Sequence, residues 1–396
     1  MDELRVLPPV VPTATAPDFF SPSQVAFGHE CLLRLVLMGE KRAPRLISHP
    51  AAEIGTVFHR LLEMSACGQV HREGDLESDL QRTLAALIGD AEARLASQTG
   101  KGEPISLRST VPPLIWRRKV RRLIDTATRV YSPGGRSGHP GTRAKVTAFE
   151  ELPEEGVWSE VSIRAPSLRM AGRMDLVQRS PGHTIIKDLK TGRVLDDEGS
   201  VLPKIQTQLR VYGLMVLELK GSQALDLLVD DGVEHIVPFD AAVAAQTRDQ
   251  IGEFTTALPT GKEFASADLA KVGDWCGACA FRHVCPTYRE VAPTLWAKSP
   301  FSLAPDIWGC VEKVERPASA TTIALRDDAG RSVRIFGLNT SVANAVNLGQ
   351  RVWFFGLHPQ PALKLGSQYI HPVNFFATLP STIPQTAWSL EILREP

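Results

Sequence analysis

Two carboxylates and a lysine stand close together near the middle of the chain, within the stretch LRMAGRMDLVQRSPGHTIIKDLK at residues 168–190. Asp175 lies in the first half of this stretch, and Asp188 and Lys190 lie at its end. Paired carboxylates can hold a hard divalent cation, and an ammonium group beside them can orient a water molecule for attack on a phosphate. These residue types therefore indicate metal-dependent phosphate chemistry. For a D-x-K triplet alone, the alternative is a solvated hairpin with scattered charges.

Two strands joined by a tight turn would position these three residues. Apolar residues alternate with small or polar ones around Asp175, which predicts a strand. Residues 180–182 read Ser-Pro-Gly, a turn signal, and a short apolar run at residues 185–186 opens a second strand. Because side chains two residues apart project from one face of a strand, we expect Asp188 and Lys190 to share a face.

The order of these motifs resembles that of the PD-(D/E)XK nucleases, specifically their RecB-like branch. In that branch a G-x-(I/M)-D strand precedes a D/E-x-K-T-G strand, and here the motifs read GRMD at residues 172–175 and DLKTG at residues 188–192. The resemblance covers roughly residues 19–290 and implies an α/β fold in which helices flank a mixed sheet. It also implies that Asp175, Asp188 and the backbone carbonyl of Leu189 bind Mg²⁺ or Mn²⁺. Lys190 would then act on the attacking water.

Two further residues fit the metal site that this resemblance implies. His59 lies in a predicted helix at residues 51–66, within the pattern G-T-x-x-H-x-x-L-E that supplies the family's histidine ligand. Glu160 lies in a predicted strand at residues 157–164 and resembles an upstream glutamate of RecB-like enzymes. The alternative for His59 is a surface or core histidine without a metal, and the alternative for Glu160 is an ordinary strand carboxylate.

A predicted helix at residues 201–219 carries Gln208 and Tyr212, which are four residues apart and therefore share a face. Their Q-L-x-x-Y pattern resembles the family motif that packs beside the active site. The resemblance implies that they contact the scissile phosphate or hold the surroundings of Lys190. The alternative for Tyr212 is a core side chain.

A helix predicted at residues 114–131 is strongly basic. Residues 111–131 contain six basic residues and one acid. Such a face is either solvated or a surface that contacts DNA phosphates. The candidate DNA-binding residues are Arg117, Arg118, Lys119, Arg121 and Arg122.

Three cysteines lie close together in the sequence, Cys276, Cys279 and Cys285, with C-x2-C-x5-C spacing that ends in Cys-Pro. In a chain this long, such clustering indicates a metal or an iron–sulfur cluster rather than a disulfide scaffold. A fourth ligand is required, and nearby His283 could complete a zinc site.

The family resemblance offers another fourth ligand, Cys31. Ser21, with Pro22 and Gln24, predicts the start of a helix that continues through Cys31 to Leu35. This opening resembles that of iron–sulfur RecB-like nucleases, including CRISPR-associated and AddB-type domains. In that branch one N-terminal and three C-terminal cysteines hold a [4Fe–4S] cluster, for which we expect a structural role. Cys67 and Cys310 fit no ligand spacing and are predicted to be buried thiols.

The composition changes after about residue 300, where short strand candidates recur. A helical stretch at residues 339–345 falls between the third and fourth strands. Five strands with a helix after the third is the order of an OB-fold, which binds single strands through aromatic side chains and a basic groove. A protein partner is the alternative, because the segment is not markedly basic. The strand candidates are residues 307–313, 321–326, 332–336, 351–357 and 368–376.

The overall composition is that of a soluble globular protein, with 43% hydrophobic and 22% charged residues and zero net charge. Zero net charge leaves room for a local basic groove. No apolar run reaches the roughly 18 residues of a membrane helix, and the first residues lack the pattern of a signal peptide, so we expect a cytoplasmic protein. The expected units are an N-terminal arm at residues 1–18, a nuclease domain at 19–295 and an OB-like barrel at 300–396.

The sequence thus predicts a Mg²⁺- or Mn²⁺-dependent deoxyribonuclease, which by family analogy acts on single-stranded or end-bearing DNA. Repair, recombination and phage defence all use this nuclease type. One alternative is a non-catalytic DNA-binding accessory subunit of a helicase or of a repair or defence complex, and another is an RNA-directed enzyme or binder. The sequence contains no Walker-type G-x-x-x-x-G-K-[ST] motif, so unwinding would need a separate helicase partner.

Overall fold

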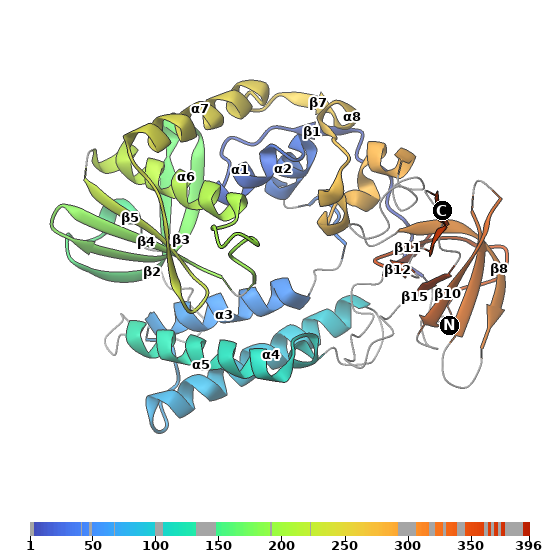
Figure 1. Cartoon of the computed structure of the whole chain (residues 1–396), viewed down its shortest axis with the longest axis horizontal. Coiled ribbons are helices and arrows are strands. Elements are labelled where there is room, and N and C mark those ends of the chain that lie inside the picture. Colours follow the sequence, from blue (N-terminus) through green and yellow to red (C-terminus); the bar gives the residue numbers. More distant parts are fainter. Residues whose placement is uncertain are drawn as a thin grey trace.

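The computed structural model describes the chain apart from residues 1–3, 41, 47–49, 67, 100–105, 132–147, 191, 222, 292–305, 317–320, 328–329, 339–344, 360–362, 366–367, 371–373 and 377–390. Two large β-sheets lie at opposite ends of the molecule, and the segment that contains the clustered cysteines lies between them (Figure 1). Helices pack on both sides of the first sheet, whereas the second sheet is formed by the C-terminal strands.

The first sheet is mixed and five-stranded. β2, β3 and β4 form an antiparallel meander, and β4 and β5 run parallel because α6 (Pro203–Lys220) crosses over between them. The predicted mixed sheet flanked by helices is therefore confirmed. Its strands in spatial order are β2 (Gly156–Ala165), β3 (Met170–Ser180), β4 (His183–Leu189), β5 (Ala224–Asp230) and β6 (Glu234–Val237).

The helices of this part form two layers with separate hydrophobic cores (Figure 1). One layer packs α6 and its neighbours against the sheet, and the other packs three helices together on the opposite side, next to the ends of β2 and β4. The first layer contains α1 (Pro22–Gly28), α2 (Leu32–Gly39), α6 and α7 (Ala241–Ala257), and the second contains α3 (Pro50–Ala66), α4 (Leu76–Thr99) and α5 (Pro113–Val130).

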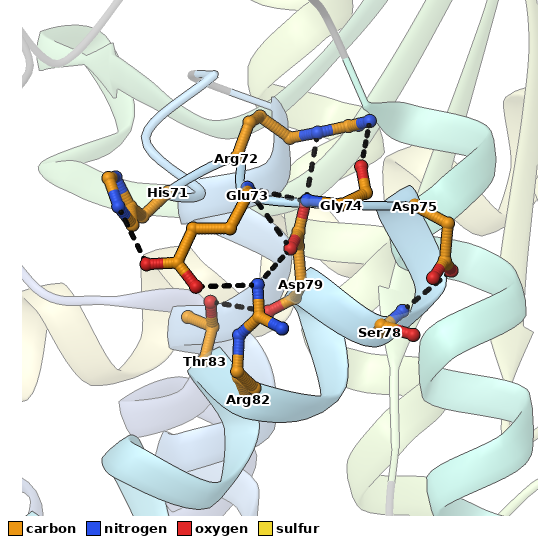
Figure 2. Close-up of polar contacts among 9 residues, drawn as sticks. All are labelled: His71, Arg72, Glu73, Gly74, Asp75, Ser78, Asp79, Arg82 and Thr83. Carbon is orange, nitrogen blue, oxygen red and sulfur yellow. Dashed lines mark hydrogen bonds and ion pairs between the residues drawn. The ribbon is translucent and has the colours of Figure 1, made fainter.

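A buried carboxylate fixes the connection between α3 and α4 (Figure 2). Asp79, which is 1% exposed, accepts hydrogen bonds from two backbone N–H groups of the loop and pairs with Arg72 and Arg82. Arg72 in turn stacks over the ring of Tyr131, with 5.5 Å between the guanidinium carbon and the ring centroid. Because Tyr131 directly follows α5, this cluster links the ends of all three helices of the second layer.

The structure corrects the prediction of one continuous helix from Pro22 to Leu35. Ser21 caps α1 as predicted, in a capping box with Gln24, but α1 ends at Gly28 and α2 begins at Leu32. Glycine has low helix propensity, which favours the break. Cys31 therefore lies between the helices, in extended conformation, as the N-cap residue of α2.

The C-terminal sheet has seven strands in the order β12-β15-β10-β9-β8-β11-β16. All pairs are antiparallel except β10 and β15. The predicted last strand at residues 368–376 is divided between two strands, and residues 339–344 of the predicted helix lie outside the described residues. The strands are β8 (Ile307–Glu315), β9 (Thr321–Arg326), β10 (Ser332–Leu338), β11 (Arg351–Phe355), β12 (His358–Pro359), β15 (Asn374–Phe376) and β16 (Glu391–Arg394), with β13 (Leu363–Leu365) and β14 (Gln368–Ile370) as a separate hairpin.

A buried charged network joins the cysteine-containing segment to the C-terminal sheet. Asp306, which is 2% exposed, lies 2.5 Å from Arg282 Nε and accepts hydrogen bonds from the Tyr288 hydroxyl at 2.6 Å and the Gly356 N–H at 2.9 Å. Beside it the ring of Trp308 stacks on that of another tryptophan in the same sheet. The cysteine-containing segment and the C-terminal sheet therefore share a hydrophobic core.

Residues 4–18 contact several of these units. Leu7 donates its N–H to the carbonyl of Arg394 in β16, and Val11 donates to the carbonyl of Val284. β1 (Thr13–Thr15) pairs with β7 (Glu263–Ala265), which is followed by the short helix α8 (Ser266–Leu269). Within the described residues, no helix has both the length and the apolar character needed to cross a membrane.

Candidate active site

Three carboxylates stand in one row across three neighbouring strands. Pairs on either side of Glu160 in the β2–β3 register place it opposite Asp175. The last β3–β4 pair is Leu176 with Lys187, so the next residues beyond it, Asp175 and Asp188, also face each other. Opposed residues of antiparallel strands project to one face, which gathers the three acids at one site.

His59 approaches this row from α3. Its Nδ1 lies 3.5 Å from Asp175 Oδ1 and 3.8 Å from Glu160 Oε1. Burial, and secondly the Lys190 ammonium, lower the pKa of His59, which favours the neutral imidazole that serves as a metal ligand. Ligand atoms of His59, Glu160 and Asp175 all lie within 4.8 Å of one another.

Glu160 is held in an unfavourable state in two respects. Its φ of 53° is in the left-handed region, which is uncommon for a residue other than glycine and marks backbone strain. Burial, with Asp175 as a further contribution, raises the pKa of Glu160 to about 7, even though Arg173 Nε lies 2.6 Å from its carboxylate. A cation at this position would relieve the repulsion between the two acids.

Asp188 and Lys190 form the other half of the site. Gln208 of α6 joins them, donating to Asp188 Oδ1 at 3.0 Å and accepting from Lys190 Nζ at 3.3 Å. Burial, and secondly the Asp175 carboxylate, raise the pKa of Asp188 to about 6. Lys190 Nζ lies 2.7 Å from Asp188 Oδ2, but this buried oxygen accepts no well-directed hydrogen bond.

The backbone of Leu189 and the side chain of Tyr212 support these acids. Leu189 donates its N–H to Asp175 Oδ2 at 2.7 Å, and this contributes to the orientation of both. Tyr212 donates its hydroxyl to the carbonyl of Arg173 at 2.7 Å and packs on Gly172, where any Cβ would lie 2.9 Å from the ring. Gln208 thus contacts an acid of the row directly, whereas Tyr212 contacts β3, the strand that carries Asp175.

The basic residues of α5 divide between two sides of the helix. Lys119 and Arg122 line a cleft next to His59 and Lys190. Two others, Arg117 and Arg121, line a different groove between α4 and α5, among several acidic side chains. Arg118 is exposed. The structure therefore brings only Lys119 and Arg122 close to the acidic row.

The four clustered cysteines come together although Cys31 is distant in the sequence. Each of Cys276, Cys279 and Cys285 has its thiol pKa raised first by burial, with Cys31 among the contributing neighbours. Burial raises the pKa of the Cys276 thiol to about 11 and that of the Cys285 thiol to about 12. Backbone N–H groups point at two of the sulfurs, from Gly273 to Cys276 and from Tyr288 to Cys285.

Three further predictions concern His283, Cys310 and Cys67. His283 is buried, with its ring packed edge-on against Phe355 of the C-terminal sheet at 6.0 Å. Cys310 in β8 is half-exposed, so its prediction as a buried thiol is wrong; its Sγ lies 3.4 Å from the carbonyl of Gly349. Cys67 lies outside the described residues.

Sequence reasoning missed Arg173 and the network around Asp306. Arg173 stands within the GRMD motif, and only the β2–β3 register reveals its ion pair with Glu160. Asp306 pairs with Arg282, which lies 24 residues earlier, and no local pattern marks either residue as buried.

Comparison with known protein families gives a match to about two thirds of the chain. The model of the PD-(D/E)XK nuclease superfamily matches residues 19–286, which contain all three acids of the row, Lys190 and the four clustered cysteines. A comparison with curated proteins gives no match. The superfamily implies a phosphodiester hydrolase that uses divalent metal ions. On the extent of this match, the chain belongs to the PD-(D/E)XK nuclease superfamily.

Proposed function

We propose that this protein is a Mg²⁺- or Mn²⁺-dependent deoxyribonuclease that acts on single-stranded or end-bearing DNA. The observation that carries the proposal is the row of Glu160, Asp175 and Asp188, with Lys190 held at its edge by Gln208. Family membership supports nuclease chemistry, and the choice of DNA rests on the family analogy.

The donor atoms at the row suit a divalent cation. Carboxylate oxygens are preferred by Mg²⁺ and Mn²⁺, and the neutral His59 adds a nitrogen donor. The raised pKa values of Glu160 and Asp188 fit a site whose acids a cation keeps ionised, and the buried Asp188 Oδ2 has capacity for a further partner. We assign the ion to His59, Asp175 and Asp188, with Glu160 as an additional ligand and the Leu189 carbonyl beside them. When bound, such an ion lowers the pKa of a water molecule and polarises a phosphoryl oxygen.

Lys190 and Gln208 would act on the substrate side of the row. The Lys190 ammonium lies between Asp188 Oδ2 and Gln208 Oε1, which limits its motion. An ammonium group has three N–H donors, so it can still donate to a further group. It would orient the attacking water and stabilise charge on the phosphate oxygens. Tyr212 would keep β3, and with it Asp175, in place through the Arg173 carbonyl.

We also propose that Cys31, Cys276, Cys279 and Cys285 hold a structural [4Fe–4S] cluster. Cys31 contributes to the raised pKa of each of the other three thiols, which supports one site that all four cysteines share. A [4Fe–4S] cluster takes four thiolate ligands, as the family analogy implies, and a zinc ion bound by these cysteines is the alternative.

We propose that the C-terminal strands form an OB-like barrel that packs against a nuclease domain at residues 19–295. The β8-β9-β10 meander, the parallel β10–β15 pair and the β8–β11 pair support this assignment. Trp353 and Phe355 pack in the junction with the cysteine-containing segment, which leaves them unsuited to stacking on DNA bases.

Cleavage of labelled DNA by anaerobically purified protein tests the proposal. Single-stranded, duplex and all-RNA substrates are incubated with Mn²⁺ and, in parallel, with EDTA. The proposal predicts Mn²⁺-dependent cutting of DNA, strongest for single strands or ends. DNA binding without cutting by a folded, iron-loaded sample would favour the accessory-subunit alternative, and preferential cutting of RNA would replace the substrate assignment.

A further inference from the structure

Arg173 adds a second positive charge to the acidic row, at the end opposite Lys190. It lies two residues before Asp175 in β3, so both side chains project from the same face of the sheet. Its Nε lies 2.6 Å from Glu160 Oε2, and at the other end of the row Lys190 Nζ lies 2.7 Å from Asp188 Oδ2. The three acids therefore lie between two cations that belong to the chain itself.

The backbone of Arg173 is held on two sides. Its carbonyl accepts a hydrogen bond from the Tyr212 hydroxyl at 2.7 Å, and in the sheet it stands opposite Ser162 of β2. Its side chain is 53% exposed, and in the described part of the chain the acid that it pairs with is Glu160. The guanidinium therefore keeps its place through this carboxylate rather than through packing.

Four of the six carboxylate oxygens of the row already face a donor or a cation. Two of them face the cations at the ends of the row, Glu160 Oε2 and Asp188 Oδ2. Asp175 Oδ2 accepts a hydrogen bond from the backbone N–H of Leu189 at 2.7 Å. Asp188 Oδ1 accepts one from Gln208 at 3.0 Å. Two oxygens of the row are left without such a partner.

These two oxygens converge on His59. Glu160 Oε1 lies 3.8 Å from His59 Nδ1, and Asp175 Oδ1 lies 3.5 Å from it. Asp188 Oδ2 faces Lys190 without a well-directed hydrogen bond, so it keeps lone pairs for the same ion. A second ion, about 3.5–4 Å from the first, would need carboxylate oxygens that the two cations contact. The free oxygens thus indicate one ion position.

Charge balance also favours a single divalent ion. Three ionised carboxylates, Arg173 and Lys190 together leave one negative charge, and His59 is favoured in its neutral form. One divalent ion and one phosphodiester group bring the total to zero, whereas a second ion would leave two uncompensated positive charges. Uncompensated charge is costly in a buried site, and Asp188 is 3% exposed.

We infer that the acidic row takes one divalent cation and that Arg173 occupies, beside Glu160 Oε2, the place of a second. Arg173 is a positioning residue, because it leaves Glu160 Oε1 directed at His59 and keeps the other oxygen from binding metal. The inference rests on the proposed function, since it takes the row as a metal site. It predicts that loss of Arg173 changes the number of ions bound.

Counting bound Mn²⁺ in the absence of DNA tests this inference without cleavage. Unbound Mn²⁺ is measured by electron paramagnetic resonance while the full chain is titrated, and Asp175→Ala gives the binding elsewhere on the chain. The wild type should hold one Mn²⁺ at the row, and Arg173→Gln should hold two. Arg173→Lys keeps the charge and should hold one. Circular dichroism verifies that each variant is folded, and Arg173→Met replaces Arg173→Gln if the latter unfolds.

Two controls show whether the additional ion depends on Glu160. Arg164 is exposed in β2 and stands opposite Ala171, on the same face of the sheet as Arg173. No acid among the described residues pairs with Arg164, which packs over the ring of Phe19 instead. Arg164→Gln therefore removes an equal charge without freeing a carboxylate, and it should keep the wild-type count. Adding Glu160→Gln to Arg173→Gln should return the count to one.

Three outcomes would overturn the inference: two ions at the wild-type row, one ion in folded Arg173→Gln, or a second ion in Arg164→Gln. The result is separable from that of the proposed function. One Mn²⁺ in the wild type and two in Arg173→Gln, without cleavage of DNA, would support the inference and reject the nuclease proposal. Mn²⁺-dependent cleavage by a wild type that holds two ions at the row would reject the inference while the nuclease proposal stands.

Discussion

Replacement of Glu160 by glutamine should stabilise the metal-free protein while weakening its affinity for metal. The pKa of Glu160 is raised to about 7 from an ordinary value of 4.5. The protonated form is therefore favoured by folding, and its contribution to stability is complete below the ordinary pKa and is lost as the pH rises to about 7. At about pH 8 the ionised carboxylate costs about 3 kcal/mol, which solvent screening at this partly accessible group reduces to about 2 kcal/mol.

Chemical denaturation in EDTA at about pH 5 and about pH 8 measures this effect. Glu160→Gln should unfold at higher denaturant concentration than the wild type at the higher pH, and the difference should shrink at the lower pH. Mn²⁺ should raise the stability of the wild type more than that of the variant, since glutamine supplies no charge to the ion. A variant that is less stable than the wild type at the higher pH, or one that Mn²⁺ stabilises equally, would refute the placement of Glu160 at a metal site.

Three further substitutions test other parts of the account. Cys31→Ser should lose the brown colour and the absorbance near roughly 400 nm of an iron–sulfur cluster; normal iron content would remove Cys31 from the ligand set. Asp79→Ala should lower the free energy of unfolding by about 2–3 kcal/mol, because a buried charged acceptor of several hydrogen bonds is lost; a change below about 0.5 kcal/mol would contradict the role drawn in Figure 2. Asp306→Ala leaves the buried Arg282 guanidinium unpaired and should lower the free energy of unfolding by about 3–5 kcal/mol. If the variant resists proteolysis between the cysteine-containing segment and the C-terminal sheet as well as the wild type does, the Asp306 network does not anchor that junction.

Local patterns predicted most of the elements around the site. Alternating apolar residues and turn signals gave strands within one or two residues of β3 and β4, and helical periodicity gave α3 and α6. These elements carry Asp175, Asp188, His59 and Gln208, so the residues whose positions depend on one strand or one helix were accessible from sequence. Their catalytic and ligand roles stay predictions.

Features that depend on contacts distant in the sequence were harder to predict. Glu160 joins the row only through the β2–β3 register and a left-handed backbone, which no strand pattern indicates. Cys31 lies between two helices and near a cysteine segment some 245 residues later, a contact that no helical pattern indicates. The basic face of α5 was read as one surface, but packing against α4 on one side and the β5–β6 turn on the other separates Arg121 from Lys119.

Cleavage of labelled single-stranded DNA with Mn²⁺ by Lys190→Ala, beside Lys187→Ala, tests the central claim most directly. Both variants remove a lysine from the same stretch, but Lys187 pairs with Glu234 and Lys190 contacts Asp188 and Gln208. We predict that Lys190→Ala loses at least about 100-fold in rate. Lys187→Ala should stay within a few-fold of the wild type. A folded Lys190→Ala protein that cuts DNA at the wild-type rate would contradict the assignment of the acidic row as the active site.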